Sequence, residues 1–229
     1  MDFEPILVLI GGGHASGKKT AASLLKKELQ RAFLNVKLDI KLLDMENFLK
    51  PENKIQESSY SSSKSAAITV KGIGEHDFPP LKPSRYDFSQ LQITLKQVMV
   101  KGRIIILHGL YALYDKEIRA ISKIKVFISS DADTRLIRWI RRDVVGGHQN
   151  LETVINRYLQ GARAEMNDFI NPTKEFSDVI MPTGPESNSI ELLVDGIIPY
   201  ISKLEAHVPH LRSSGSLVPE DKQSFYELT

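Results

Sequence analysis

The chain has 229 residues, 41% of them hydrophobic, which is enough to bury the core of one α/β domain. A formal net charge of only +2 gives no reason to expect nucleic acid or a membrane surface as a partner. The absence of cysteine excludes disulfides and thiolate metal sites.

The N-terminus and the apolar runs bear on where the protein resides. Asp2 and Glu4 stand where a secretory signal would have basic residues. No apolar run reaches the ~18 residues that a membrane span needs. We therefore expect a protein of the cytoplasm, with the nucleus as a second compartment.

Short apolar runs alternate along the chain with stretches of helical periodicity. The runs predicted as strands are residues 5–11, 36–43, 103–108, 123–129 and 177–182. The stretches predicted as helices are residues 17–33, 87–101, 131–145, 151–166 and 190–204. Pro199 is expected to bend or interrupt the last helix. The strands are nearly continuous and rich in β-branched residues, which is typical of a parallel sheet, so the alternation predicts a doubly wound α/β fold.

Three segments are not expected to form regular structure. Residues 51–65 are rich in serine, and we expect a mobile surface loop there. Residues 77–83 contain prolines that are incompatible with a helix or a central strand. The tail, residues 205–229, has no clear periodicity and is expected to be poorly ordered. The domain itself is therefore predicted to span residues 1–204.

A glycine-rich loop follows the first predicted strand and precedes the first predicted helix. Gly12 and the pair Gly17-Lys18 have the spacing G-x-x-x-x-G-K of a phosphate-binding loop. In such loops backbone N–H groups surround phosphate oxygens, and the helix N-terminus adds positive charge. The residues expected to contact ATP are Gly12, Gly13, His14, Ala15, Ser16, Gly17, Lys18, Lys19 and Thr20. The alternative is a glycine-rich turn that only caps a helix.

The residue after Lys18 departs from this motif. A serine or threonine hydroxyl at that position normally binds Mg²⁺, whereas Lys19 has no oxygen to offer. Thr20 comes one residue later and is rotated by roughly 100° around the helix. The motif thus predicts nucleotide binding but lacks the usual metal ligand.

Three further stretches follow in chain order. They are Gly109-Leu110-Tyr111-Ala112-Leu113-Tyr114, then Ser130-Asp131-Ala132-Asp133-Thr134-Arg135-Leu136 with Arg138 and Arg142-Asp143, then Asn171-Pro172-Thr173-Lys174. With the phosphate loop, they resemble the uridine–cytidine kinase family of P-loop kinases over about residues 6–201. The resemblance implies a P-loop NTPase-type five-stranded parallel sheet flanked by helices, with a helical lid at residues 131–150. It also implies phosphorylation of the 5′-hydroxyl of uridine or cytidine by ATP with Mg²⁺.

The same resemblance assigns catalytic roles. Glu46 falls at the family's catalytic aspartate, with Asp44 as a substitute two residues earlier. Lys18 and Arg142 are expected to act with this carboxylate in phosphoryl transfer. The alternative for Glu46 is a solvated acid on a loop.

The lid and the metal positions complete the implied site. Arg135, Arg138 and Arg142 recur at helical spacing, which suits phosphate oxygens, although a solvated basic stripe has the same spacing. The family's metal ligands fall at Lys19 and His108, so no metal ligand is predicted at these positions. His108 is either a ligand for a softer metal or a hydrogen-bonded residue at a strand end.

The implied nucleoside pocket lacks some of the family's parts. Lys101-Gly102-Arg103 joins helix to strand directly, where the family inserts a β-hairpin, and Arg157 replaces a glutamine that contacts the nucleoside. Three hypotheses remain: a uridine kinase, a nucleotide-binding pseudokinase that acts through a partner, and a kinase for another small hydroxylated acceptor. The oligomeric state is left open.

Overall fold

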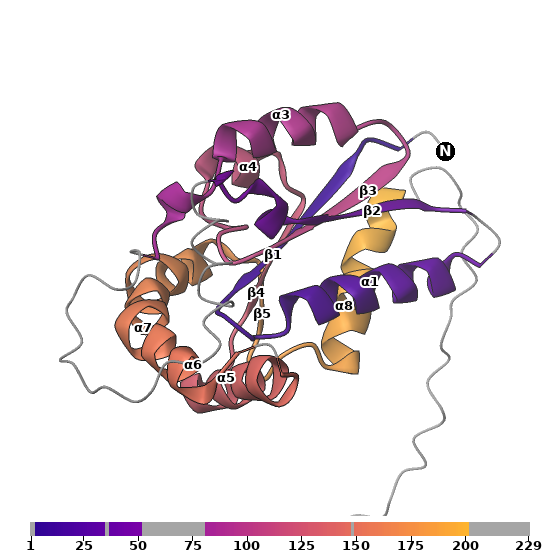
Figure 1. The fold of residues 1–229 in the computed structure, drawn as a ribbon. Coiled ribbons are helices and arrows are strands. Elements are labelled where there is room, and N and C mark those ends of the chain that lie inside the picture. The colour runs from indigo at the N-terminus through magenta and orange to yellow at the C-terminus, as the bar shows by residue number, and fades with distance from the viewer. Residues whose placement is uncertain (1–2, 35–36, 52–80, 148, 202–229) are drawn as a thin grey trace, which may run out of the picture.

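The computed structural model describes residues 3–34, 37–51, 81–147 and 149–201. They form a sheet with helices on both faces and further helices beyond one end of it (Figure 1). Within these residues no helix has the length and apolar character needed to cross a membrane. Residues 52–65, residues 77–80 and the tail from 205 lie outside the described part, so the expectations for them stay predictions.

The sheet has five strands, all parallel. The strands are β1 (Ile6–Gly12), β2 (Asp39–Asp44), β3 (Arg103–His108), β4 (Ile124–Ile128) and β5 (Val179–Met181). Their order is β2-β3-β1-β4-β5, which confirms the predicted doubly wound arrangement. Because the strands are parallel, their carboxyl ends meet at one edge, where ligands bind in open α/β sheets.

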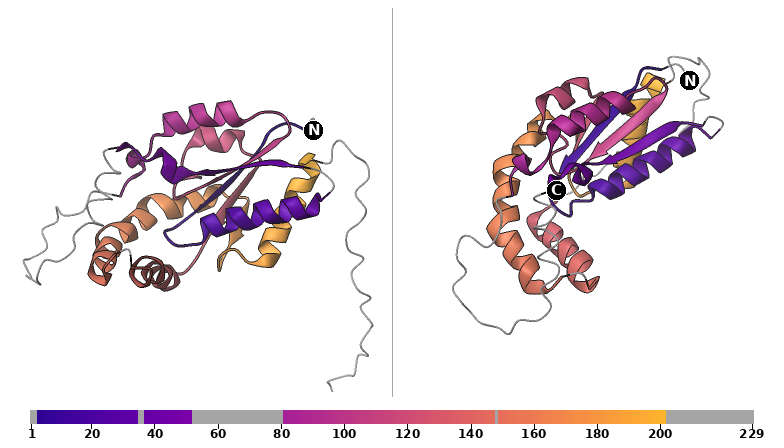
Figure 2. Two further views of the ribbon diagram at one scale, coloured as in Figure 1. Left: turned by 45° about the vertical axis from the view of Figure 1, so that its right-hand side comes forward. Right: turned by 45° about the horizontal axis from the view of Figure 1, so that its top comes forward.

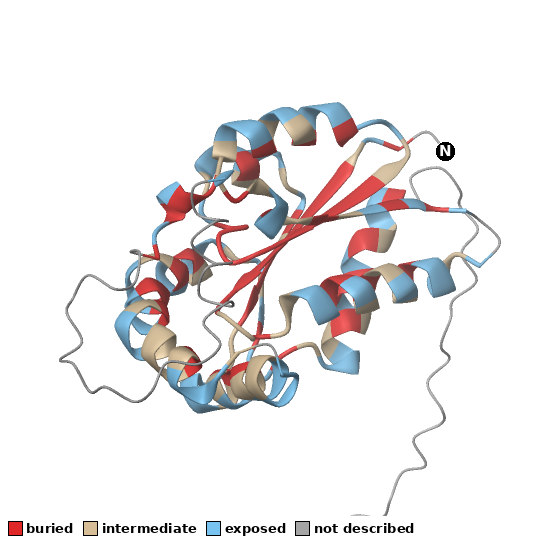
Figure 3. Ribbon diagram, in the orientation of Figure 1, coloured by how far each residue is buried: buried red, intermediate tan, exposed pale blue. Residues whose placement is uncertain are grey.

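Alternate residues of β1 face opposite layers of helices. The flanking helices are α1 (Lys18–Ala32), α3 (Phe88–Val98), α4 (Lys116–Ile121) and α8 (Ser187–Ile201). Ile6, Val8 and Ile10 pack with α1 and α8, whereas Leu7 and Leu9 pack with α3 and α4. Figure 3 shows buried central strands between helices whose outer surfaces are exposed. This three-layer core holds the phosphate loop at the end of its central strand.

A second group of helices covers the predicted lid, residues 131–150, and continues beyond it to residue 170. Its members are α5 (Ala132–Ile140), α6 (Leu151–Arg157) and α7 (Arg163–Glu165), with π-helical turns at Arg141–Val145, Tyr158–Ala162 and Met166–Ile170. They pack around a small apolar cluster of their own, made of Leu81, Trp139, Val154 and Ala162. Figure 2 shows these helices standing beyond one end of the sheet.

The expectation that Pro199 interrupts the last helix is wrong, and one helix was not predicted. Helix α8 contains Pro199 and is not interrupted by it. Proline has no N–H, so the carbonyl of Asp195 loses its usual partner in the helix. Because Asp195 is exposed, water can solvate this carbonyl and the helix continues. Helix α4 was not predicted, because a six-residue helix with one buried side chain, Ile118, has no readable apolar period. Its capping residue, Asp115, accepts the N–H of Ile118 at 2.9 Å and was the available signal.

Candidate functional site

The loop between β1 and α1 passes through left-handed backbone conformations. The φ angle is +145° at Gly12, +52° at Ala15 and +102° at Gly17. A side chain at Gly12 would place its Cβ 2.5 Å from the carbonyl oxygen of Ile128, so only glycine fits there. The glycine spacing seen in the sequence is therefore required by the path of the backbone.

The loop offers donors to an anion. Helix α1 begins at Lys18 with no side-chain hydrogen bond at its N-cap, so the N–H groups of its first turn lack that partner. The hydroxyl of Ser16 is fully buried and has no hydrogen-bond partner among the described residues. Amides around a helix N-terminus are the chemistry that binds phosphate oxygens. The loop residues therefore fit the polyphosphate chain of a nucleotide.

Lys18 is held close to this loop. Its Nζ donates a hydrogen bond to the carbonyl oxygen of Gly13 at 2.6 Å, which uses one of its three N–H groups. Burial lowers the pKa of Lys18 to about 8, although the nearby carboxylate of Glu46 opposes this shift. A desolvated ammonium at the start of a helix is suited to an anionic ligand.

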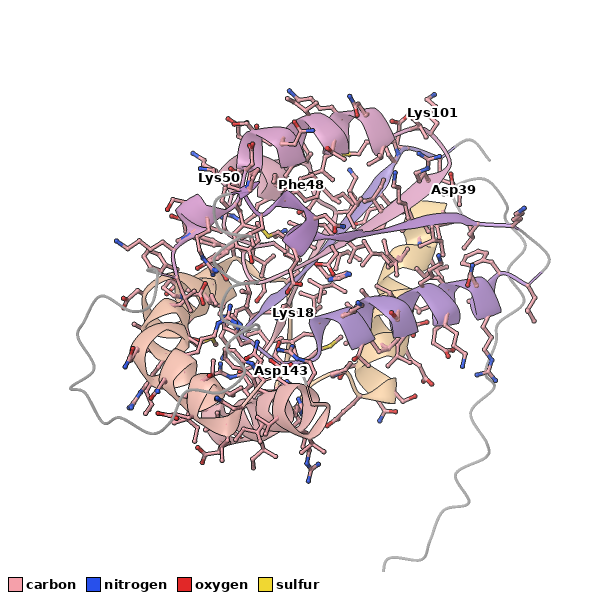
Figure 4. All side chains as sticks on the ribbon, in the orientation of Figure 1. Lys18, Asp39, Phe48, Lys50, Lys101 and Asp143 are labelled. Atoms are coloured by element: carbon pink, nitrogen blue, oxygen red, sulfur yellow. The ribbon has the colours of Figure 1, made fainter. Side chains whose placement is uncertain are left out.

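A cavity of about 1110 Å³ opens in front of the loop. In Figure 4, Lys18 lies between the segment that carries Phe48 and the lid segment that carries Asp143. The residues that line the cavity are His14, Ala15, Gly17, Lys18, Lys19, Thr20, Asp44, Glu46, Leu49, Arg85, Tyr86, His108, Gly109, Leu110, Arg138, Trp139, Arg142, Asp143, Gln149, Arg157, Thr183, Gly184, Pro185 and Glu186. The phosphate loop, the carboxyl ends of β2 and β3, and the lid thus share one space.

Most of the predicted site residues meet in this cavity. Lys18, Glu46 and Arg142 come from three separate segments and all line it, as does Arg138. The loop residues that do not line it are buried behind its wall: Gly12, Gly13 and Ser16. The tertiary structure thus brings the predicted phosphate-binding and acidic residues to one place.

Arg135 does not join them. Its side chain is buried, and its Nε donates to the carbonyl oxygen of Ser130 at 3.1 Å. The guanidinium packs against Gly13, where an added Cβ would lie 2.8 Å from its Nη1. Arg135 therefore supports the phosphate loop from behind, whereas Arg138 and Arg142 face the cavity.

Two carboxylates and an imidazole line the far side of the cavity. Asp44 ends β2, and its Oδ1 accepts the backbone N–H of Glu46 at 3.0 Å. His108 ends β3 beside Asp44, with its Nδ1 3.9 Å from that Oδ1. Burial lowers the pKa of His108, an effect that Asp44 opposes and that Lys18 and Lys19 reinforce. The imidazole is therefore mainly neutral at pH 7.

The donors at this point do not fit Mg²⁺ in the usual way. Mg²⁺ prefers oxygen ligands, but Lys19 presents an ammonium and His108 a ring nitrogen. Across the described ranges of the chain, no group of three or more His, Cys, Asp or Glu side chains could hold a metal ion. The carboxylates of Asp44 and Glu46 remain as oxygen donors in the cavity, with the charge of Lys19 nearby.

The lid contributes two guanidinium groups. Arg142 forms a two-bond ion pair with Asp143, at 2.6 and 3.0 Å, and this hydrogen bonding raises the pKa of Arg142. Arg138 donates to Ser130 Oγ at 3.3 Å and approaches the carbonyl oxygen of Ser16 at 3.5 Å. Both cations are thus held beside the phosphate loop by contacts within the protein.

Sequence reasoning missed a buried polar cluster next to the loop, which we call the Glu165 cluster. The carboxylate of Glu165 accepts hydrogen bonds from His14 Nε2 at 2.6 Å, Arg85 Nη2 at 2.8 Å and the Tyr111 hydroxyl at 2.5 Å. One signal was available in the sequence, because helical spacing places Glu165 on the same face of the predicted helix 151–166 as the apolar residues Val154 and Ala162. A carboxylate on such an apolar face indicates a buried partner.

Comparison with known proteins decides the family. A model described as "Phosphoribulokinase / Uridine kinase family" matches residues 7–190. This chain belongs to that family. It is a family of kinases, which implies ATP as the phosphoryl donor, usually Mg²⁺ as the cofactor, and a small-molecule substrate as the acceptor.

Several curated family members resemble the chain over most of its length. It is 29% identical to "Putative uridine kinase DAS2" of Saccharomyces cerevisiae, covering 100% of this chain and 98% of that protein. It is 30% identical to "Uridine kinase" of Clostridium tetani, covering 90% of this chain and 100% of that protein. It is also 30% identical to "Uridine kinase" of Lactobacillus johnsonii, covering 88% and 98%.

A solved structure shares the fold. The crystal structure of a "putative fructose transport system kinase" from Silicibacter sp. TM1040 matches with a TM-score of 0.53 and 18% identity, covering 78% of this chain and 90% of that one. At this identity the match concerns architecture alone, and it agrees with the five-stranded parallel sheet flanked by helices.

Proposed function

We propose that this family member binds ATP in the cavity and transfers its terminal phosphoryl group to the 5′-hydroxyl of uridine or cytidine, a reaction of pyrimidine salvage. One observation supports this function above others: a single cavity joins the phosphate loop to the carboxylates of Asp44 and Glu46. Phosphoryl transfer needs an anchored polyphosphate and a nearby acceptor for the hydroxyl proton. The full-length likeness to proteins named uridine kinase supports the choice of acceptor.

The phosphate loop supplies the nucleotide-binding half of the site. ATP provides the phosphoryl group that is transferred. In this assignment the first-turn amides of α1 donate hydrogen bonds to its phosphate oxygens. Lys18 and Arg138 offset the negative charge of the polyphosphate from two sides of the loop.

The carboxylates supply the acceptor half. In this assignment Glu46 accepts the proton of the attacking hydroxyl, while Asp44 fixes the backbone of Glu46 through the 3.0 Å hydrogen bond. Arg142 lines the same cavity and stabilises the charge on the transferring group. Because the donors at Lys19 and His108 do not fit Mg²⁺, no step is assigned to a metal.

Lys19 and His108 support a second candidate, a pseudokinase that binds nucleotide and acts through a partner. An ammonium and an imidazole where oxygen ligands are needed favour binding without turnover. A third candidate, a kinase for another small hydroxylated acceptor, is favoured by the short turn between α3 and β3. That turn, at residues 99–102, leaves no room for an inserted hairpin.

Calorimetric titration with ATP and an assay of ADP formation separate these candidates. Both are run with and without Mg²⁺, and the assay includes uridine, cytidine and a panel of small hydroxylated compounds. Formation of ADP that depends on uridine or cytidine supports the proposed reaction, and dependence on another compound supports the third candidate. Binding of ATP without turnover supports the pseudokinase. Absence of ATP binding by the wild-type chain, with the Lys18→Met variant as the baseline, overturns all three.

A further inference from the structure

The Glu165 cluster joins segments that are far apart in the sequence. Glu165 belongs to helix α7, which follows the predicted lid in the chain, and His14 belongs to the phosphate loop. Arg85 lies in the segment before α3, and Tyr111 in the segment after β3. The Glu165 side chain has no exposed surface, and those of His14 and Arg85 are 17% and 7% exposed. A buried carboxylate holds its donors firmly, because a buried charged oxygen left without a donor is costly. His14 is the donor to Oε2, whereas Arg85 and Tyr111 share Oε1.

The charge state of the cluster supports this reading. Burial raises the pKa of Glu165, but the hydrogen bond from His14 and the positive charge of Arg85 outweigh burial and hold it at about 2. Burial lowers the pKa of His14, although Glu165 opposes that shift. At neutral pH an ionised Glu165 therefore accepts a hydrogen bond from a mainly neutral His14 ring.

His14 is held from its other side by an aromatic ring. Its imidazole stacks on the indole of Trp139, with the ring centroids 4.8 Å apart and the planes 14° from parallel. Trp139 is buried in α5, and its Nε1 donates to Asp143 at 2.7 Å. Asp143 pairs with Arg142, so the contacts continue from the phosphate loop to a guanidinium that faces the cavity.

We propose that Glu165 is a positioning residue: it holds His14 against Trp139 and so fixes the phosphate loop and the lid in one arrangement that favours polyphosphate binding. The effect on ligand affinity rests on the proposed nucleotide binding. Glu165 does not line the cavity, so it acts through His14 and not by touching a ligand. A loop held in place before the ligand arrives loses less conformational freedom on binding.

The sequence supplies a direct probe, since Trp139 is its single tryptophan. Fluorescence emission of the full chain without ligand reports the His14–Trp139 stack. We expect His14→Ala and Glu165→Gln to change the emission in the same way, and the double variant to match either single one. Tyr111→Phe removes a hydrogen bond from the same carboxylate but leaves His14 in place, so it is the matched control and should keep wild-type emission.

Titration with ATP and with inorganic tripolyphosphate measures the consequence for binding. We expect a dissociation constant about tenfold higher in His14→Ala and Glu165→Gln, with no further rise in the double variant, because a hydrogen bond to a charged group is lost once. Tyr111→Phe should bind as the wild type does.

Several outcomes overturn the positioning role. Emission from His14→Ala that equals that of the wild type would overturn it. Because His14 lies at the edge of the cluster, this variant tests the role even if Glu165→Gln fails to fold. The positioning role is also overturned if the changes in emission or dissociation constant caused by the two substitutions add up in the double variant. A wild-type chain that binds neither ATP nor tripolyphosphate overturns the proposed function and the affinity effect, while the emission comparison still decides whether Glu165 holds His14 in place.

Discussion

Asp44 and His108 are direct neighbours in the parallel register of β2 and β3, with Asp44 Oδ1 and His108 Nδ1 3.9 Å apart. The pair lies at the carboxyl edge of the sheet and lines the cavity with Lys18 and Lys19. A mainly neutral imidazole and an ammonium therefore stand beside the carboxylates that would otherwise attract a divalent cation. The chemistry of this corner differs from that of a Mg²⁺ site.

The first prediction concerns this corner. ATP should bind the wild-type chain with nearly the same dissociation constant in Mg²⁺ and in EDTA. The double variant Lys19→Thr with His108→Glu regains two oxygen donors, so its affinity should rise about tenfold when Mg²⁺ is added, or ~1.4 kcal/mol. Isothermal titration calorimetry measures both. Lys27→Thr, at an exposed position of α1 that does not line the cavity, is the control. A strong Mg²⁺ requirement in the wild type would contradict this expectation.

The second prediction follows from the low pKa of Lys18, which burial brings from 10.5 to about 8. A bound polyphosphate favours the charged ammonium, so ATP affinity should fall as pH rises above 8, by about tenfold per pH unit for one linked proton. Calorimetry at pH 8.5 in buffers of different ionisation enthalpy should detect proton uptake on binding. Lys18→Arg should remove this step, because arginine stays protonated in this range.

The same shift affects stability with a definite sign. Between pH 8 and 10.5 the unfolded chain holds a proton on Lys18 that the folded chain has lost, so this residue's contribution to the free energy of unfolding rises with pH. Urea unfolding of the wild type and of Lys18→Met at pH 7.5 and 10.5 measures it. At pH 7.5 the free energy of unfolding should be lower for the wild type than for Lys18→Met, and this difference should shrink at pH 10.5.

The third prediction concerns the acceptor side. Glu46→Gln should lower kcat for the best acceptor by about 10²–10⁴, the usual contribution of a general base, and leave the dissociation constant of ATP nearly unchanged. Asp44→Asn is the matched variant and should have a smaller effect on kcat, since its amide oxygen still accepts the backbone N–H of Glu46 and only the negative charge beside His108 is lost. The reverse ranking would transfer the role of base to Asp44.

The fourth prediction compares two glycines with positive φ. At Gly12, with φ +145°, an added Cβ meets the backbone oxygen of Ile128 at 2.5 Å, whereas at Gly147, with φ +75°, it meets no described atom within 4 Å. Gly147→Ala should cost about 1 kcal/mol of stability through backbone strain alone. Gly12→Ala should cost clearly more and also weaken ATP binding. Chemical denaturation measures the difference, and equal costs would show that the steric contact is relieved easily.

Local patterns explain what could be predicted from sequence. The strand at 103–108 was placed correctly because an almost unbroken run of branched side chains suits only a strand buried on both faces. The phosphate loop was found because its geometry depends on glycines a few residues apart. The boundary of β2 was predicted three residues too early, since edge residues such as Lys37 carry no periodic signal.

The features that could not be predicted from the sequence depend on contacts between distant segments. His14 and Glu165 are 151 positions apart, and neither belongs to a motif that names the other. Helical spacing placed Arg135, Arg138 and Arg142 on one face, but the helix changes to a π-helical turn at Arg141–Val145. In addition, Arg135 turns under the phosphate loop, and only its packing against Gly13 reveals this.

The amino-acid order alone determined the alternation of strands and helices, the phosphate loop and the absence of a hydroxyl at Lys19, because each depends on residues close together in the chain. Tertiary structure decided which charges share a cavity, which arginine is buried, and that the carboxylate of Glu165 hydrogen-bonds to His14 of the phosphate loop. These depend on packing between distant segments, where burial and the need to pair every buried polar atom select one arrangement.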